Sequence, residues 1–566
     1  MAVLSAADIP GQNDCSPVMG DDPIFAEDKV MYNGQAVFAV VADSRFAARN
    51  AVDLVKLDIT PLPAVVTIEQ AIKQQSFFEN PMCLTVGEPE AEYDSSLTQI
   101  DGELLVGGQE HFYLEGQAAI AQPLENGGIK LSVSSQHPSE IQHKVAAMLG
   151  ISYVDVEVEV RRMGGGFGGK ESQSNLTACI AALAAQKTGR PARLVYDRDD
   201  DMRLTGKRHD VKLIYKAGFD SDGKIKSLIL DQYFRCGMSY DLSKAIAIRA
   251  LTHADNAYYI PNSRLRAFLC KTHTVSNTAF RGFGGPQGMI GIERIMDQIA
   301  TRLGRDPVEI RKVNYYPDYA DGNFQCTPYG QIVKDGILNT LTDQLSVNAN
   351  YLDRRKEIDL YNKSSPIKRR GLGFMPVKFG ISFNRTMLNQ AGALVHVYTD
   401  GSVHLNHGGT EMGQGLHTKV IQIVADVFGL DVSRVRISNT STGKVPNTSA
   451  TAASSGTDLN GMAALRAAET IKLRMADYLA KIYQSRANDI DFSSGSVILP
   501  SGQSLSFSEA VNQCHMGRIS LSSTGFYSTP EIHWDDNSLT GSPYYYFAYG
   551  VALSEVIVDT LTGESR

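Results

Sequence analysis

Four turns made of glycine or other small residues constrain this chain more than any other feature. They occupy residues 162–171, 279–287, 408–415 and 448–456, and each lies between a strand-like and a helix-like segment. Such a turn leaves main-chain N–H groups unpaired beside the positive end of a helix dipole, and glycine lets a ligand approach the backbone closely. One turn alone is usually a tight connection, but four together favour an extended, polar, phosphorylated ligand.

The first turn shows this arrangement most clearly. Ser139 and Gln142 have capping-box spacing at the start of a helix that Gly150 is expected to end. Alternating valines in residues 154–160 predict a half-exposed strand, because side chains on a strand alternate between its two faces. The segment 175–187, rich in Ala and Leu, predicts the helix that follows the turn.

Composition and charge exclude several classes of protein. The 566 residues are 43% apolar and 20% charged, which is typical of a soluble chain with several globular units. A net charge of −8 provides no basic field for nucleic acid or anionic lipid. The seven cysteines lack metal-site spacing, and no apolar run is long enough to span a membrane. We expect a cytoplasmic protein with reduced thiols, no membrane or nucleic-acid partner, and no metal held by side chains.

Two nucleotide-binding motifs formally match the first turn. Residues 164–169 read Gly-x-Gly-x-x-Gly, as in a dinucleotide fingerprint, and Asp197 ends a later strand-like run where a ribose-binding acid would stand. Residues 164–170 also fit a P-loop, but Glu171 replaces the Ser or Thr that binds Mg²⁺ and would repel phosphate. The fingerprint is weak evidence by itself, and the P-loop is disfavoured.

The residues in and around the turns resemble the molybdopterin-binding subunits of the xanthine dehydrogenase and aldehyde oxidase family. The similar segments are 107–115, 163–171, 279–287, 383–396 and 408–419. They occur in the family's order, and the resemblance covers essentially the whole chain. It implies a mixed α+β and α/β fold.

The resemblance and the punctuation of the sequence together divide the chain. Residues 1–85 contain short strand-like runs and a proline-punctuated stretch, and they match part of a small α/β hammerhead domain. Residues 86–345 and 371–566 are then two large molybdopterin-binding α/β regions, the second of them incomplete at its C-terminal end. The charge-rich segment 346–370 is predicted to be the linker between the two regions.

The resemblance implies a molybdenum–molybdopterin cofactor whose own dithiolene sulfurs hold the metal. The positions that match the cofactor lining are Gln109, Phe167, Gly168, Arg281, Gln414, Ala452, Ala453 and Ser454. Without the motifs, Gln414 would be interpreted as a helix-cap amide and Arg281 as half of a surface ion pair. The family's electron path further implies [2Fe–2S] clusters and FAD on a partner subunit or on segments outside this sequence, NAD as the final acceptor, and a dimer of heterodimers.

A second set of residues matches the substrate-binding positions of the family. Glu171 and Arg249 match the pair that hydrogen-bonds a purine, and Phe283 and Phe383 match the two rings that hold it. Aromatic rings suit a flat heterocycle, and a guanidinium stabilises negative charge that develops on it. Read alone, the two phenylalanines would be core residues and Arg249 a solvated helix charge. Asn384 stands where purine-specific relatives typically carry Thr, and its amide is larger.

These matches imply a hydroxylase that converts hypoxanthine and xanthine to urate. A hydroxylase of aldehydes or of another N-heterocycle is one alternative, and an inactive scaffold that keeps the pterin is another. The family's general-base glutamate lies in a Gly-Glu-Pro motif beyond the segment that matches residues 544–564, so we expect this sequence alone to be inactive. A truncated sequence, a split gene or a degenerate non-enzyme would each account for the missing motif.

Overall fold

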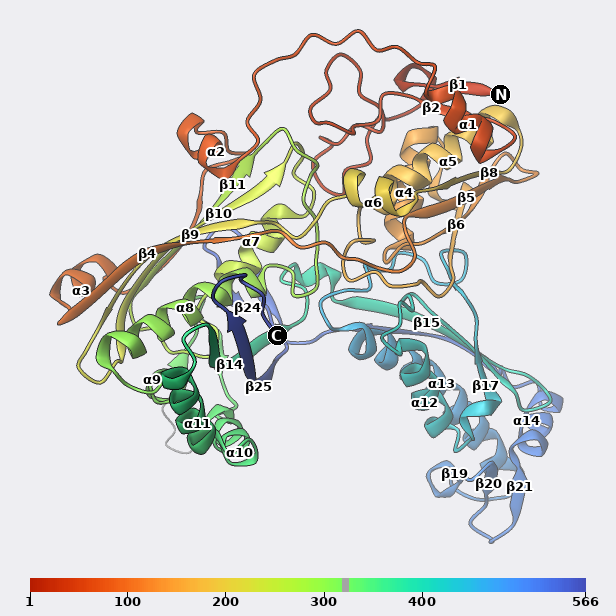
Figure 1. Cartoon of the computed structure of the whole chain (residues 1–566). Helices are drawn as coiled ribbons and strands as arrows, with labels where there is room; N and C mark the ends of the chain where they lie inside the picture. Colours follow the sequence, from red (N-terminus) through yellow and green to blue (C-terminus); the bar gives the residue numbers. More distant parts are fainter. Residues whose placement is uncertain (318–324) are drawn as a thin grey trace.

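The computed structural model describes residues 1–317 and 325–566. Three helix-covered sheets and one long two-stranded ribbon make up most of the chain, and Figure 1 shows the three sheets in different parts of the molecule, with the ribbon beside the second sheet. The predicted mixed α/β class is confirmed. No helix within the two described ranges has the length and apolar character needed to cross a membrane.

The first sheet has the strand order β18-β7-β6-β5-β8. Its strands are β5 (Ala118–Pro123), β6 (Ile129–Val133), β7 (Val156–Val160), β8 (Ala192–Val195) and β18 (Thr440–Ser441). Helices α4 (Pro138–Leu149) and α5 (Ser174–Thr188) pack on it, and α5 is buried along most of its length because it is Ala-rich on all sides. The N-terminal strands β1 (Ala2–Leu4) and β2 (Ala39–Val41) pair with each other, and Leu4 joins the same hydrophobic core.

The second sheet has the order β3-β11-β10-β9-β4. Its strands are β3 (Met82–Val86), β4 (Thr98–Val106), β9 (Val211–Phe219), β10 (Ile225–Gly237) and β11 (Ser263–Lys271). Helices α7 (Ser243–Leu251), α8 (Gly285–Leu303) and α9 (Pro307–Asn314) accompany it. Strands β10 and β11 are parallel and the other pairs are antiparallel.

The third sheet has the order β17-β16-β15-β22. Its strands are β15 (Gln390–Val397), β16 (Val403–His407), β17 (Val435–Ile437) and β22 (Ser522–Ser528). Helix α13 (Gly456–Ile482) covers one face, with α12 (Leu416–Val427) packed beside it. A small three-stranded sheet of β19 (Asp491–Ser493), β20 (Ser496–Ile498) and β21 (Ser504–Ser506), with helix α14 (Phe507–Met516), lies at the far end in Figure 1.

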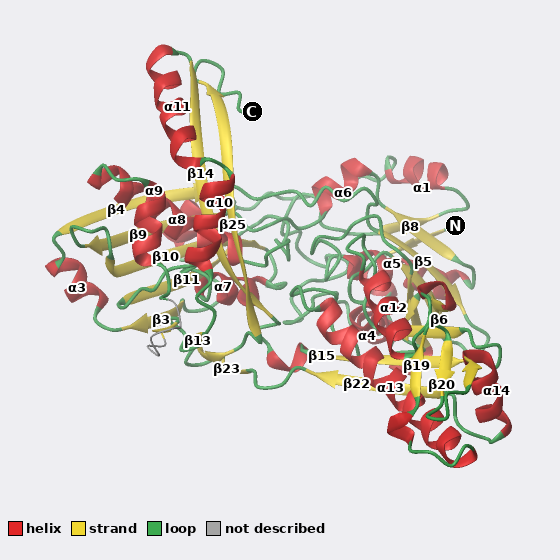
Figure 2. Ribbon diagram, turned by 90° about the horizontal axis from the view of Figure 1, so that it is seen from below, coloured by secondary structure: helices red, strands yellow, loops and turns green. Residues whose placement is uncertain are grey.

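Strands β14 (Lys368–Ile381) and β25 (Tyr546–Asp559) pair along their whole length as an antiparallel ribbon. Segment 346–370, predicted to be a linker, is largely the helix α11 (Tyr351–Ser364), which Figure 2 shows lying along this ribbon with α10 (Leu338–Asn348) nearby. Phe547 of β25 packs into the core of the second sheet, so the ribbon joins distant parts of the sequence. The remaining short α-helices and strands are α1 (Arg45–Val52), α2 (Ile68–Gln74), α3 (Pro89–Ser95), α6 (Arg198–Leu204), β12 (Gln325–Cys326), β13 (Ile332–Val333), β23 (His533–Asp535) and β24 (Thr540–Ser542).

The start of α4 differs from the sequence-based expectation. Gly150 ends the helix in a left-handed conformation, as predicted, but the capping box at Ser139 and Gln142 is wrong. Pro138 begins the helix, and the Ser139 hydroxyl bonds to Thr448 instead of capping it. The side chain takes a partner from the fourth turn because that turn is packed directly against the helix start.

Candidate functional site at four converging turns

Each of the four turns connects a strand to the start of a helix. The first joins β7 to α5, the second follows β11 and leads into α8, the third joins β16 to α12, and the fourth joins β18 to α13. The predicted strand–turn–helix arrangement is therefore confirmed. Because β18 pairs with β7 in the first sheet, the fourth turn is brought next to the first although it belongs to the other half of the sequence.

Hydrogen bonds donated by main-chain N–H groups join the turns directly to one another. The donor and acceptor pairs, each 2.8 Å apart, are Arg281 N–H to Phe167 O, Met163 N–H to Glu411 O, and Thr410 N–H to the Thr451 hydroxyl. These bonds link the second, third and fourth turns into one cluster around the first. The structure thus creates one composite site from four segments that are far apart in the sequence.

Gln136 is the centre of this cluster, and sequence analysis did not single it out. Its side chain is buried, its Oε1 accepts the Gly168 N–H at 2.9 Å, and its Nε2 donates to Thr451 O at 3.0 Å. Its own N–H donates to Lys170 O at 2.7 Å, and its carbonyl accepts the Thr451 N–H at 2.9 Å. The signal available in the sequence was a polar run ending at the helix-starting Pro138.

Glycine is required at Gly168 for two separate reasons. Its φ of +100° is one that other residues rarely adopt, and an added Cβ would lie 2.8 Å from the carbonyl carbon of Ala279. The neighbouring Phe167 also has a positive φ, 54°, and its ring is 41% exposed. The first and second turns therefore approach each other as closely as the backbone permits.

The predicted cofactor residues Gln109 and Gln414 lie exposed beside the turns but already have protein partners. Gln109 accepts a hydrogen bond from Arg208 Nε at 2.6 Å. Gln414 Nε2 donates to Thr410 O at 2.9 Å, and its Oε1 accepts the Met412 N–H at 2.7 Å. In this structure Gln414 therefore stabilises its own turn, as the helix-cap interpretation supposed.

Two other features of the turns fit a bound anionic group. Ala452, Ala453 and Ser454 precede the 27-residue helix α13, and their main-chain N–H groups have no hydrogen-bond acceptor among the described residues. Ala453 and Ser454 have φ values of 55° and 58°. The Arg281 side chain is exposed and forms no ion pair within the described parts of the chain. Amides at a helix start and a guanidinium, each without a partner among the described residues, are both suited to phosphate.

Glu171 is held in an unusual environment for a carboxyl group. Its side chain is 7% exposed and has no hydrogen-bond partner in the described parts of the chain. Burial raises the pKa of Glu171 to about 8; His137 and Arg249 lower it less, and Glu140 and Asp241 raise it further. The group is therefore mostly protonated at neutral pH, and it can donate a hydrogen bond as well as accept one.

Arg249 on α7 is buried, so it is not the solvated helix charge that its sequence context suggested. Its two terminal nitrogens donate to the main-chain carbonyls of Gly380, at 2.9 Å, and of Ser382. Its guanidinium carbon also lies 5.0 Å from the ring centre of Tyr544. The guanidinium group is thus hydrogen-bonded to the backbone at the end of β14. Its buried Nε has no partner in the described ranges.

The other predicted substrate residues lie on two separate segments. Phe383 and Asn384 come one residue after the end of β14 and are buried, with Asn384 Nδ2 donating to Ala245 O at 3.3 Å. Phe283 is half-buried in the second turn, with a φ of 50°. The Arg249 contact to Ser382 connects the first segment to α7.

Neither nucleotide-binding interpretation of the first turn agrees with the structure. The Lys170 amine is buried and donates to Glu115 O at 2.6 Å and to the Ser134 hydroxyl at 2.8 Å, so it faces the core instead of a phosphate. Asp197 caps α6 and forms ion pairs with Arg45 and Arg49. Both residues are occupied by structural contacts.

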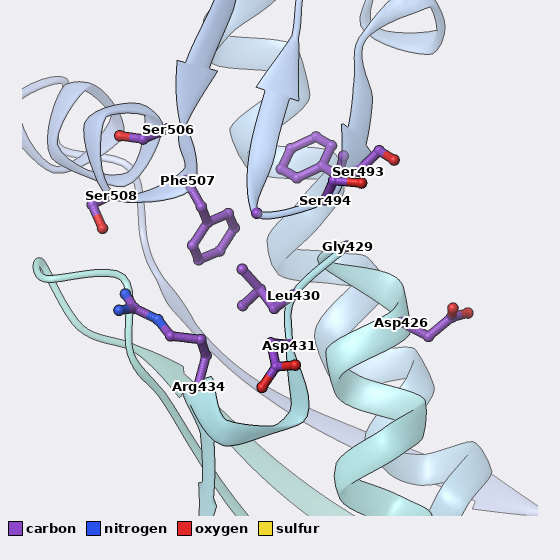
Figure 3. Close-up of a pocket in the computed structure, with 12 residues that line it drawn as sticks. Asp426, Gly429, Leu430, Asp431, Arg434, Ser493, Ser494, Ser506, Phe507 and Ser508 are labelled. Carbon is purple, nitrogen blue, oxygen red and sulfur yellow. The ribbon is translucent and has the colours of Figure 1, made fainter.

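A separate cavity of about 800 Å³ lies away from the turns, between the end of α12, the β19–β21 sheet and the start of α14 (Figure 3). Its lining includes Arg434, Asp431 and Phe507 but none of the residues predicted from the sequence to bind cofactor or substrate. The composite site at the turns combines main-chain amides and a buried acid that lack partners among the described residues.

Comparison with protein families gives matches along nearly the whole chain. Residues 72–315 and 344–566 each match a molybdopterin cofactor-binding domain. Residues 1–63 match the a/b hammerhead domain of aldehyde oxidase and xanthine dehydrogenase.

Individual relatives agree with these domain matches. Xanthine dehydrogenase of Dictyostelium discoideum is 43% identical over 566 residues, and xanthine dehydrogenase/oxidase of Gallus gallus is 44% identical over 564 residues. Both alignments cover 100% of this chain but only 40% of the relative, so the chain spans less than half the length of these proteins.

Solved structures with a similar fold include the aldehyde oxidoreductase of Desulfovibrio gigas, with a TM-score of 0.87, 23% identity, and coverage of 100% of this chain and 60% of that one. Quinoline 2-oxidoreductase of Pseudomonas putida 86 gives a TM-score of 0.88 at 23% identity, covering 100% of this chain and 74% of that one.

Proposed function

Since the chain belongs to the aldehyde oxidase and xanthine dehydrogenase family, as its molybdopterin-binding region, we propose that the whole enzyme hydroxylates purines, converting hypoxanthine and xanthine to urate. The observation that carries this proposal is the Glu171 carboxyl at the end of the first turn, which is buried and has no hydrogen-bond partner among the described residues. A buried acid without a partner is costly, and a substrate with hydrogen-bonding heteroatoms would satisfy it.

Molybdenum–molybdopterin would supply the oxidative hydroxylation chemistry when bound. The unpaired amides of residues 452–454 and the exposed Arg281 would hold its anionic part, and Phe167 and Gly168 would line the group. Gln109 and Gln414 would complete the lining. Electron transfer to a [2Fe–2S] and FAD partner subunit, with NAD as acceptor and a dimer of heterodimers as the assembly, belongs to the same proposal.

The site residues have distinct roles in this proposal. Glu171, mostly protonated at neutral pH, would donate a hydrogen bond to a ring nitrogen or carbonyl oxygen of the purine. The Arg249 cation would stabilise negative charge that develops on the ring. Its contacts with the end of β14 would also hold Phe383 in place as one wall of the substrate slot, the space proposed to lie between Phe283 and Phe383. Phe283 and Phe383 would bury the two faces of the heterocycle.

An aldehyde or another N-heterocycle is the second candidate substrate, and two observations favour it. Both terminal nitrogens of Arg249 are engaged by main-chain carbonyls, which leaves fewer donors for a purine. Asn384 is also larger than the Thr typical of purine-specific relatives.

Steady-state kinetics of the whole enzyme distinguish the two candidates. We expect Glu171→Ala to lower kcat/KM for xanthine by about 10- to 100-fold, as for loss of one buried hydrogen bond, and to leave an aromatic aldehyde nearly unaffected. Equal losses on both substrates would show that Glu171 does not recognise the purine.

A further inference from the structure

The backbone is strained just after β14, immediately before the proposed substrate residues Phe383 and Asn384. Ser382 has a φ of +143°, in a region that residues with a side chain rarely adopt. It directly precedes Phe383 and Asn384, which the family resemblance places in the substrate slot. A strained conformation persists only where the surroundings impose it, so the contacts that hold this bend set where the Phe383 ring lies.

The strained backbone around Ser382 is held first by hydrogen bonds from α7 and from the segment that follows it. His253 Nε2 accepts the Gly380 N–H at 3.0 Å, and Arg249 donates to the carbonyls of Gly380 and Ser382. These bonds fix the chain before Phe383 but make no contact with the main chain of Phe383 itself.

Asn389 provides the second set of these hydrogen bonds. Its side chain is 2% exposed, its Oδ1 accepts the Phe383 N–H at 2.8 Å, and its Nδ2 donates to Phe383 O at 2.9 Å. The same amide nitrogen lies 3.3 Å from Thr386 O and 3.5 Å from Arg385 O. Within the described ranges, no other side chain hydrogen-bonds the main chain of Phe383. One buried carboxamide therefore satisfies both polar main-chain groups of the residue that carries the ring.

We propose that Asn389 is a positioning residue that determines substrate specificity, by fixing the Phe383 ring and the adjacent Asn384 amide as one wall of the slot. The inference rests on the proposed function, because it assigns Asn389 to the same site. A flat bicyclic substrate depends on the spacing between the walls, whereas a smaller aldehyde fills less of the slot. Loosening Phe383 should therefore penalise purines more than aldehydes.

The test compares Asn389→Ala and the milder Asn389→Ser with a matched control in the whole enzyme. Asn314 is also 2% exposed, and it bridges other main-chain groups: its Oδ1 accepts the Ile225 N–H at 2.8 Å, and its Nδ2 donates to Gly223 O at 2.9 Å. Asn314→Ala should therefore cost similar stability without touching the slot. The measurements are KM and kcat for xanthine and an aromatic aldehyde, the Kd of urate, melting temperature, and hydrogen exchange of the Phe383 amide.

We expect Asn389→Ala to raise the KM for xanthine and the Kd of urate about tenfold, with aldehyde kinetics changed less than about twofold. Hydrogen exchange of the Phe383 amide should accelerate. Asn389→Ser should change the xanthine KM, the urate Kd and this exchange rate in the same direction but by less, and it provides the test if Asn389→Ala does not fold. Asn314→Ala should lower the melting temperature and change none of the purine parameters.

Two results would overturn the inference. Unchanged xanthine KM and urate Kd in a folded Asn389 variant would reduce Asn389 to a stabilising role, and equal losses on purine and aldehyde would remove the specificity claim. A wild-type enzyme that neither binds urate nor oxidises xanthine would instead overturn the proposed function, and the purine-selecting role of Asn389 with it.

Discussion

Gln136 and Thr451 lie 315 residues apart in the sequence and exchange two hydrogen bonds, one from the Gln136 side chain to Thr451 O at 3.0 Å and one from the Thr451 N–H to Gln136 O at 2.9 Å. The same carboxamide accepts the Gly168 N–H. The first and fourth turns are therefore held together by one buried side chain.

Replacing Gln136 by Ala should lower the free energy of unfolding by about 2–4 kcal/mol, because it removes the partners of the part-buried Gly168 N–H and of the buried Thr451 O. Denaturant unfolding gives the free energy, and hydrogen exchange at Gly168 locates the change. Gln142 is a matched control, since within the described ranges its buried amide bonds only to Tyr153 O and Val156 O. Gln142→Ala should destabilise the protein without speeding exchange at Gly168; similar exchange in both variants would argue against the bridging role.

Stability should depend on pH through Glu171. Its pKa is about 8 in the folded chain against 4.5 for the free carboxyl, so between these values the folded state holds a proton that the unfolded state has lost. The free energy of unfolding of the wild type should therefore fall as pH rises from about 5 to about 8, by on the order of a few kcal/mol relative to Glu171→Gln. Melting curves of both proteins across this range measure the difference.

Glu411 provides a control with the opposite shift. Burial would raise the pKa of this carboxyl, but the N–H groups of His417, Gly415 and Gly413 together hold it below the ordinary value. The ionised Glu411 carboxyl therefore stabilises the folded state above the ordinary pKa, and this stabilisation is lost only in acid. The difference in free energy of unfolding between the wild type and Glu411→Gln should stay constant between about pH 6 and pH 8. A flat difference for Glu171→Gln as well would show that the Glu171 carboxyl titrates normally.

Gly168→Ala should be much more damaging than Gly413→Ala. The two glycines have φ values of +100° and +101°, but an added Cβ at Gly413 meets nothing within 4 Å, whereas at Gly168 it meets the Ala279 carbonyl carbon at 2.8 Å. We expect a loss of about 1–2 kcal/mol for Gly413→Ala from the dihedral alone, and of about 3 kcal/mol or more for Gly168→Ala. Equal losses, measured by urea unfolding, would mean that the close approach of the first two turns is relaxed at little cost.

Gln414→Ala separates the cofactor role of this residue from its structural role. Its amide is hydrogen-bonded within its own exposed turn, so we expect a stability loss of no more than about 1 kcal/mol. If the side chain also contacts the pterin, molybdenum per folded whole enzyme should fall clearly. Metal analysis and melting are measured on the same samples; a normal molybdenum content with a lowered melting temperature would leave Gln414 as a turn-stabilising residue alone.

Much of the local structure was predictable because it depends on short-range periodicity. Alternating valines predicted β7, the Ala-rich segment predicted α5, and Gly150 was correctly expected to end α4. The polar segment 346–370 was harder to interpret, since charge alone does not distinguish a linker from the solvated face of α11. Family membership was also recognisable from the turn sequences, because each motif is contiguous.

The sequence by itself determined the four strand–turn–helix units and the residues available in each. Only the tertiary structure decided which polar groups meet: the Ser139 hydroxyl takes Thr448 instead of capping its helix, Arg249 grips the end of β14, and Gln136 joins two turns. A buried polar group must find a partner wherever packing places one. That partner can lie hundreds of residues away, and no local pattern specifies it.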